Sequence, residues 1–268
     1  MTVYLIGAGP GAVDLITVRA ATILGRAQTV LVAGSLVPPE MLELCAPDAH
    51  IIDTAHMPLD QIISHIVAAD AAGHDIARLH SGDLSLYSAV TEQVRAIREH
   101  GLAVEWVPGV PAFAAAAAAL ESELTVPGVG QSLLVTRVST LSTDMPAGEQ
   151  LAELARSGVT LALHLAAHRT AEIVAALTPH YGSECPTATV AFASRSNQQI
   201  VRCPLAQLPQ SLAAAGITKT AVIFVGRVLG ADTDPDRIES YLYSHARMSK
   251  LRSDSHTHDH DSRNQDSS

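Results

Sequence analysis

The chain begins with the apolar run Thr2-Val-Tyr-Leu-Ile-Gly7 and continues directly into the turn Ala8-Gly-Pro-Gly-Ala12. A short apolar run followed at once by glycines is typical of a buried strand that leads through a tight turn into a helix. Glycine permits such a turn because it has no Cβ. This stretch therefore predicts an α/β fold whose first strand is at the N-terminus.

The same turn formally matches G-x-G-x-x-G/A, the pattern of a dinucleotide-binding loop. Two features argue against a dinucleotide. Pro10 has no backbone N–H to offer a pyrophosphate, and the apolar run 29–33 ends at Gly34 without an acidic residue to bind a ribose. A nicotinamide-dependent oxidoreductase is therefore a disfavoured alternative.

Short aliphatic runs alternate with amphipathic segments along most of the chain, which predicts βαβ units. In the first half we expect strands at 2–7, 29–33, 50–54, 75–80 and 103–107, and helices at 13–26, 59–72, 87–100 and from Pro111 through Ala119. In the second half we expect strands at 131–137, 159–165, 187–193, 199–203 and 220–226, and helices near 148–156, 168–178 and 205–214. The fold class is α/β, with two α/β domains on mostly parallel or mixed sheets.

Domain boundaries follow from breaks in this alternation. The segment 121–130 contains Pro127 and two glycines, and we interpret it as the linker between an N-terminal domain, 1–120, and a C-terminal domain, 131–248. The His- and Asp-rich tail, 249–268, is expected to be disordered, because from Ser253 onward it has no aliphatic residue to bury. Its histidines could chelate a divalent metal, but a solvated tail is favoured and no metal site is predicted.

Composition narrows the functional class. The net charge of −10 and the absence of a basic stripe exclude a nucleic-acid surface. Three cysteines without metal spacing suit a reducing compartment. We find no basic leader and no apolar run of the roughly 20 residues that a spanning helix needs. We therefore expect a cytoplasmic protein without a membrane partner.

Two further glycine turns follow expected strands, namely Ser81-Gly-Asp-Leu-Ser85 and Pro108-Gly-Val-Pro-Ala112. Open α/β sheets bind ligands at the carboxyl ends of their strands, so three such turns at one edge predict a binding site. Asp83 offers a carboxylate there, although Asp83 or Ser85 could instead cap the helix that follows.

Six motifs stand in an order that resembles the tetrapyrrole methylases over residues 2–230. They are Gly7–Ala20, Ala33–Glu40, Arg78–Tyr87, Val107–Ala118, Glu123–Gly128 and Lys219–Gly226. The resemblance implies a cleft between the two domains that binds S-adenosylmethionine, a tetrapyrrole (precorrin) substrate and a homodimer. The stretch AGSLV at 33–37 favours methylation of carbon 11 of a corrin precursor over the earlier methylations of uroporphyrinogen. A different ring carbon, a cobalt-containing precursor and a non-catalytic binding protein stay open as alternatives.

The resemblance also assigns site residues motif by motif. The expected cofactor-binding residues are Pro10, Ser81, Gly82, Asp83, Leu86, Pro111, Ala112, Leu165, Ala193, Thr220 and Ala221. The glycine loop is expected to face the tetrapyrrole, through Gly9 and Gly11 together with Ser35.

Because a corrin precursor carries many carboxylates, arginines and histidines at strand ends are candidate substrate partners. These candidates are Arg78, His80, Arg137, His164 and Arg169. Each could equally be an ordinary surface or core residue. No catalytic residue is assigned, because an electron-rich ring carbon can attack a sulfonium methyl group directly once the two are positioned.

Overall fold

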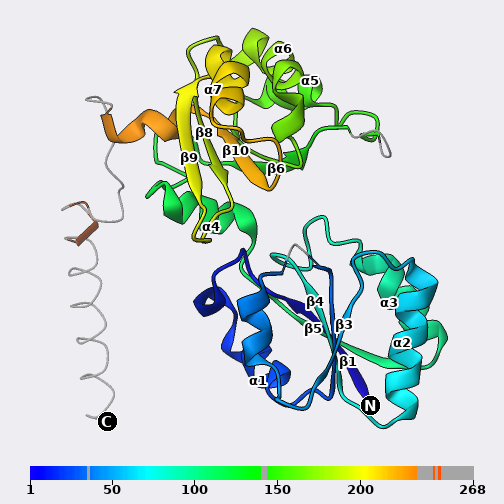
Figure 1. Ribbon diagram of the computed structural model, residues 1–268. Coiled ribbons are helices and arrows are strands. Elements are labelled where there is room, and N and C mark those ends of the chain that lie inside the picture. Colours follow the sequence, from blue (N-terminus) through cyan, green and yellow to red (C-terminus); the bar gives the residue numbers. More distant parts are fainter. Residues whose placement is uncertain (35–36, 140–143, 234–243, 245–246, 249–268) are drawn as a thin grey trace, which may run out of the picture.

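The computed structural model describes residues 1–34, 37–139, 144–233, 244 and 247–248, and it contains two sheets of five strands each (Figure 1). The N-terminal sheet is parallel throughout, in the order β3-β2-β4-β1-β5. Its strands are β1 (Thr2–Gly7), β2 (Thr29–Val32), β3 (His50–Asp53), β4 (Ile76–His80) and β5 (Ala103–Val107). A parallel sheet is confirmed for this half of the chain.

Both faces of the N-terminal sheet are covered, which explains why its strands are continuous apolar runs. One face packs against α1 (Val18–Leu24) and the short 3-10 helix η3 (Pro39–Leu44). The other face packs against α2 (Leu59–Ala71) and α3 (Val90–Glu99). Leu5 and Ile6, neighbours on β1, are both fully buried, one toward each face.

The C-terminal sheet is mixed, in the order β6-β7-β10-β8-β9. Strands β6 (Leu133–Arg137) and β7 (Thr160–His164) are parallel, and β10 (Ala221–Val225), β8 (Pro186–Ala191) and β9 (Gln199–Pro204) continue the sheet in antiparallel pairs. Its outer face is covered by α5 (Leu151–Leu154), α6 (Thr170–Tyr181) and α7 (Leu208–Ala214). The 3-10 helices η4 (Ala155–Ser157), η5 (Ala167–Arg169), η6 (Leu205–Gln207) and η7 (Arg227–Thr233) lie between or after these elements.

Helix α4 (Ala112–Ala119) covers the inner face of the C-terminal sheet, between the two domains (Figure 1). Ala115 and Ala116 pack in one cluster with Phe224 of β10. Leu124 packs against the same cluster, and its carbonyl accepts a hydrogen bond from the Thr160 hydroxyl at 3.2 Å. The sequence assigns residues 112–119 to the first domain and 121–130 to a linker; in the structure, α4 and Leu124 pack against the C-terminal sheet.

The carboxyl ends of β1, β4 and β5 meet through glycines. Gly9 and Gly82 exchange backbone hydrogen bonds of 3.1 and 2.8 Å. A Cβ on Gly7 would stand 2.6 Å from the Gly109 nitrogen, and a Cβ on Gly109 would stand 2.6 Å from the Gly7 carbonyl oxygen. Real side chains never come so close, so these backbones can touch only because the residues are glycine. The expected convergence of the three turns is confirmed.

All ten expected strands are present within two residues of the predicted bounds, whereas several helices differ more. The helix expected near 148–156 is the four-residue α5 followed by η4, and the one expected near 168–178 continues to Tyr181. The predicted helix 13–26 is interrupted: η1 (Val13–Leu15) ends at Ile16, which is extended, and α1 begins after Thr17, whose side chain accepts from the Ala20 N–H. The predicted helix 87–100 begins only at Val90, because Tyr87 and Ala89 have left-handed backbone. Within the described residues, no helix is long and apolar enough to cross a membrane.

Two substrate candidates, Arg78 and His80, lie inside the N-terminal domain. Arg78 is 4% exposed and donates hydrogen bonds to the Thr54 hydroxyl at 2.6 Å and to the Gln93 side-chain oxygen at 3.3 Å. His80 is 5% exposed. Burial, followed by the charge of Arg78, lowers the pKa of His80 to about 4, against a hydrogen bond to Ser88 that raises it. Both side chains are therefore buried inside the domain rather than exposed at the strand ends, where the sequence places them as substrate partners.

We predict that Gly109→Ala destabilises the protein by at least about 2 kcal/mol, because the new methyl group would collide with backbone atoms that cannot turn away. Thermal unfolding followed by circular dichroism checks this. The matched control is Gly25→Ala, where a Cβ would meet its nearest atom at 3.5 Å and stability should be unchanged or slightly higher. Equal effects of the two substitutions would contradict the glycine junction.

We predict that stability falls as the pH is lowered from about 6.5 toward 4, because the unfolded chain binds a proton at His80 that the folded chain excludes. This one group contributes a slope of up to about 1.4 kcal/mol per pH unit inside that window and none above it. Denaturant unfolding at several pH values should show a shallower slope for His80→Leu than for the wild type. His100→Gln, which changes an exposed histidine, should keep the wild-type slope.

Candidate functional site

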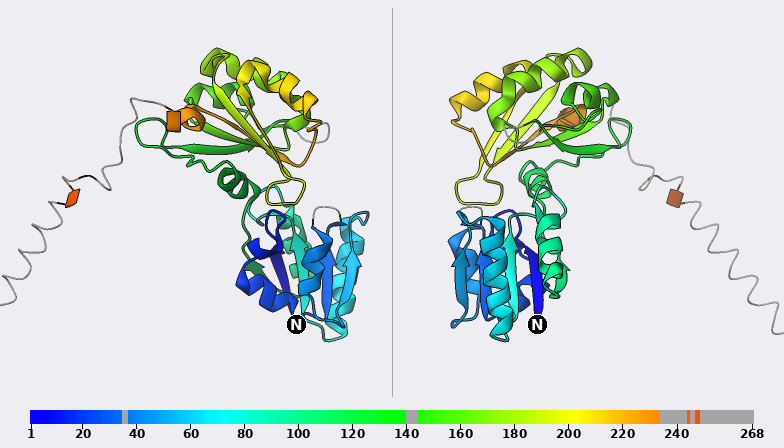
Figure 2. Two further views of the ribbon diagram at one scale, coloured as in Figure 1. Left: turned by 60° about the vertical axis from the view of Figure 1, so that its left-hand side comes forward. Right: turned by 90° about the vertical axis from the view of Figure 1, so that its right-hand side faces the viewer.

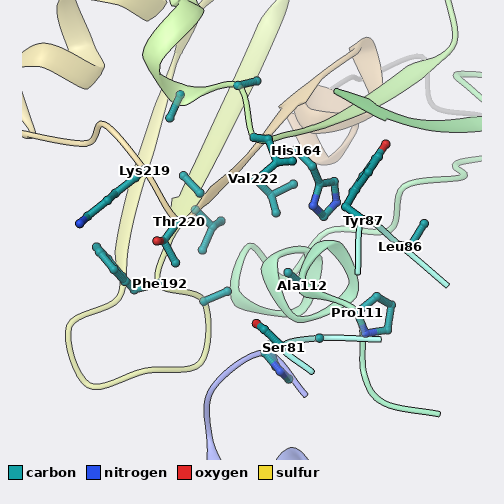
Figure 3. A pocket seen from close by; sticks show the side chains of 18 of the residues that line it. Ser81, Leu86, Tyr87, Pro111, Ala112, His164, Phe192, Lys219, Thr220 and Val222 are labelled. Atoms are coloured by element: carbon teal, nitrogen blue, oxygen red, sulfur yellow. The ribbon is translucent and has the colours of Figure 1, made fainter. Parts of the chain in front are cut away.

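A cavity of about 400 Å³ lies between the domains, and Figure 3 shows side chains from both entering it. It brings together all eleven residues that the sequence assigns to a cofactor site. The N-terminal loops and the start of α4 contribute Pro10, Ser81, Gly82, Asp83, Leu86, Pro111 and Ala112, and the C-terminal domain contributes Leu165, Ala193, Thr220 and Ala221. Residues distant in the sequence therefore form one site.

Strained backbone gathers around this cavity. Tyr87, Leu165, Phe192 and Thr220 all line it and all have φ values between 52° and 55°, which non-glycine residues rarely adopt. Each such residue costs on the order of 1 kcal/mol or more and is typical of binding sites, where strain aims a group at a ligand. Leu165 is 55% exposed and adds an apolar surface to the cavity wall. The clustering of strained residues around one cavity points to a ligand here.

Asp83 ties two of the loops together. One carboxylate oxygen accepts from the Gly109 N–H at 2.9 Å, and the other accepts from the N–H and the hydroxyl of Ser85. Partial burial alone would raise the pKa of this carboxyl. The hydrogen bonds from the Ser85 side chain and from backbone N–H groups outweigh burial and leave the pKa below its ordinary value. Asp83 is therefore an ionised group at the cavity wall, and it does not cap α3, which begins at Val90.

Among the substrate candidates that the structure describes, only His164 lines this cavity. Its ring centroid lies 5.5 Å from that of Tyr87 (Figure 3). The Phe113 ring lies edge-on to it, with 6.4 Å between the centroids. Burial lowers the pKa of His164 to about 4, so the imidazole is neutral near pH 7. A neutral ring can form hydrogen bonds but does not supply the positive charge for which the sequence proposes it as a carboxylate partner.

The other substrate candidates are scattered. Arg137 donates to the carbonyl oxygens of Val138 at 3.2 Å and Asp144 at 3.4 Å, and Arg169 forms a salt bridge of 2.6 Å with Glu172. Neither arginine lines the cavity. Gly9 is in the bridge to Gly82, and Ser35 lies outside the described residues.

A second cavity, of about 920 Å³, borders the glycine loop on the side of β2 and β3. Gly11, which the resemblance assigns to the substrate side, lines this cavity. The turn between β8 and β9 lines it as well, through Ser194 to Asn197. Arg195 lines both cavities and is not among the site residues predicted from the sequence. Tyr87, Phe192 and Lys219 are also missed, although each is adjacent to a predicted residue or motif.

In the described part of the chain, no group of three or more His, Cys, Asp or Glu side chains could hold a metal ion. The tail histidines His256, His258 and His260 lie outside that part.

Comparison with known proteins agrees with this geometry. The family model of Tetrapyrrole (Corrin/Porphyrin) Methylases matches residues 2–209. The chain is 58% identical to a precorrin-4 C(11)-methyltransferase of Rhodococcus erythropolis, over 92% of this chain and 98% of that protein.

Two solved structures are similar throughout. A cobalt precorrin-4 methyltransferase superposes with a TM-score of 0.83 at 34% identity, covering 87% of this chain and 96% of that chain. A uroporphyrin-III C-methyltransferase from Thermus thermophilus, complexed with S-adenyl homocysteine, gives a TM-score of 0.70 at 26% identity, covering 85% of this chain and 93% of that chain. The matched length, the two sheets and the interdomain cavity lead to one conclusion: the chain belongs to the tetrapyrrole methylase family.

Proposed function

We propose that this protein is an S-adenosylmethionine-dependent methyltransferase of cobalamin biosynthesis that methylates carbon 11 of precorrin-4. The observation that carries the proposal is the convergence of the eleven expected residues, from both domains, on one cavity. The 58% identity to a precorrin-4 C(11)-methyltransferase over nearly the whole length supports the choice of reaction.

The residues of the cavity fit this cofactor. A volume of about 400 Å³ falls in the range of small-molecule sites, which combine apolar walls with a few polar groups. Gly82, Ala112 and Ala193 are small and would leave room for a flat base. The ionised Asp83 and the Thr220 hydroxyl would hold polar groups of the cofactor.

When bound, the cofactor supplies an electrophilic methyl group. The chain itself contributes position and shelter. Its two domains bring rigid strand ends against each other, and Leu165, Phe192 and Ala193 make much of the wall apolar and exclude water. No acid or base is assigned. Burial lowers the pKa of His80 and of His164 to about 4, so near pH 7 neither ring carries a proton to donate and both are weak bases.

The cobalt-containing precursor is the nearest alternative substrate. Identity favours the cobalt-free one, since the chain is 58% identical to a precorrin-4 enzyme and 34% to 39% identical to cobalt-precorrin-4 enzymes. The homodimer implied by the resemblance and the cytoplasmic location expected from the sequence remain predictions, and sedimentation equilibrium checks the first.

Incubation of the protein with precorrin-4 and S-adenosylmethionine labelled in its methyl group tests the reaction. We expect the label on carbon 11, located by carbon NMR of the product. Label on another ring carbon would contradict the C(11) assignment, and transfer only to cobalt-precorrin-4 would favour the alternative substrate. Calorimetry should show binding of S-adenosylhomocysteine and none of NADH.

We predict that Asp83→Ala weakens S-adenosylhomocysteine binding at least about tenfold, because it removes an ionised group from the cavity wall and frees the Gly109 loop. Asp83→Asn can still accept from the Gly109 N–H, so it separates the loss of charge from the loss of the tie. Both variants should remain folded, since backbone hydrogen bonds between Gly9 and Gly82 persist. The control is Asp48→Asn, an exposed carboxylate away from the cavity. Unchanged affinity in Asp83→Ala would refute the assignment.

A further inference from the structure

The turn between β8 and β9 reaches across to the N-terminal domain, as the yellow loop in both views of Figure 2 shows. The Ala12 N–H donates to the Ser194 hydroxyl oxygen at 3.0 Å, which joins the turn to the glycine loop. Within the turn, the Ser194 N–H donates to the Gln198 side-chain oxygen at 2.8 Å, and the Gln198 N–H donates to the Arg195 carbonyl at 3.0 Å. The turn is therefore an ordered strap that holds Arg195 at a defined place.

Arg195 rests on Gly11. A Cβ on Gly11 would lie 2.5 Å from Arg195 Cγ and 2.9 Å from its Nε, so any side chain there would displace the arginine. Gly11 also has a φ of +155°, a conformation that residues with a Cβ rarely adopt. The glycine at this position thus creates the seat on which the arginine stem lies.

The charges around the second cavity give Arg195 a particular weight. Among the described residues that line this cavity, Glu40 and Asp53 are acidic and Arg195 is the only cation. A ligand with many carboxylates is repelled by the two acids and attracted at one point. That point borders the first cavity too, because Arg195 is in both walls.

We propose that Arg195 binds a peripheral carboxylate of the tetrapyrrole at the junction of the two cavities, and so positions the ring for methyl transfer. A guanidinium suits this role because its planar fork binds a carboxylate through two parallel hydrogen bonds. The identity of the substrate rests on the proposed function. The choice of Arg195 rests on its contact with Gly11 and on the charges that line the second cavity.

The test compares Arg195→Ala, Arg195→Lys and the wild type in methyl transfer to precorrin-4. We expect the KM for precorrin-4 to rise at least about tenfold in Arg195→Ala, with partial recovery in Arg195→Lys, because a charged hydrogen bond is lost and then partly restored. The Kd for S-adenosylhomocysteine should rise much less than the KM for precorrin-4 in both variants, since the proposed partner of Arg195 is a carboxylate of the tetrapyrrole. The control is Arg156→Ala, whose arginine pairs with Glu153 on the surface.

A binding measurement separates this inference from the methylation itself. Quenching of the fluorescence of uroporphyrin, a tetrapyrrole with eight carboxylates, reports binding without turnover. If uroporphyrin binding depends on Arg195 but the protein transfers no methyl group to precorrin-4, the proposed role of Arg195 is supported and the proposed reaction is wrong. Methyl transfer with an unchanged KM in Arg195→Ala would overturn the proposed role of Arg195. Failure of uroporphyrin to bind the wild type, or an equally large loss of S-adenosylhomocysteine affinity in Arg195→Ala, would overturn it as well.

Gly11→Ala supplies an independent variant, because the new methyl group would displace the Arg195 side chain while leaving the arginine in the sequence. Its effect on uroporphyrin affinity should be smaller in an Arg195→Ala background than in the wild type, since the collision disappears with the arginine. Fully additive effects would show that the glycine does not act through Arg195 and would overturn the seat.

Discussion

The direct contact of three loop backbones is the constraint on which the rest of the structure depends. Gly7, Gly82 and Gly109 end or follow three strands that are adjacent in the parallel sheet, and they meet with no side chain between them. A parallel sheet brings the carboxyl ends of its strands to one edge, but side chains would ordinarily hold the loops apart. Here their absence closes the edge into a floor, and Asp83 fastens that floor with a charge-assisted hydrogen bond.

The sheets were predictable because their strands are short apolar runs bounded by glycine or polar residues, a pattern that depends little on distant contacts. Helix boundaries depend more on local capping. The break at Ile16 follows from the Thr17 cap, and the late start of α3 follows from strained residues that no propensity reveals. The position of α4 was out of reach for another reason: the sequence AFAAAAAA is apolar all round, so it shows no face by which to choose between two sheets.

The eleven residues of the interdomain cavity came from motif resemblance, and the structure explains why such motifs lie far apart in sequence yet form one wall. The charged partners of the substrate were harder to predict. Arg78 and His80 follow a strand pattern that cannot say whether a polar residue will point to solvent or into a core. Arg195 lies in a hairpin turn, and its place depends on a glycine about 180 residues earlier, a contact that only the folded chain reveals.

The packing of α4 has a mechanical consequence. Because this helix packs against the C-terminal sheet, Ala112 at its first turn moves with the C-terminal domain. The chain nevertheless reaches Ala112 directly from the N-terminal domain. The chain therefore passes from the N-terminal to the C-terminal domain through the short segment from Pro108 to Pro111, in which a proline restricts the backbone at each end. If the two domains move apart, the backbone has to turn within this segment, and the hydrogen bond from the Ala12 N–H to the Ser194 hydroxyl has to break.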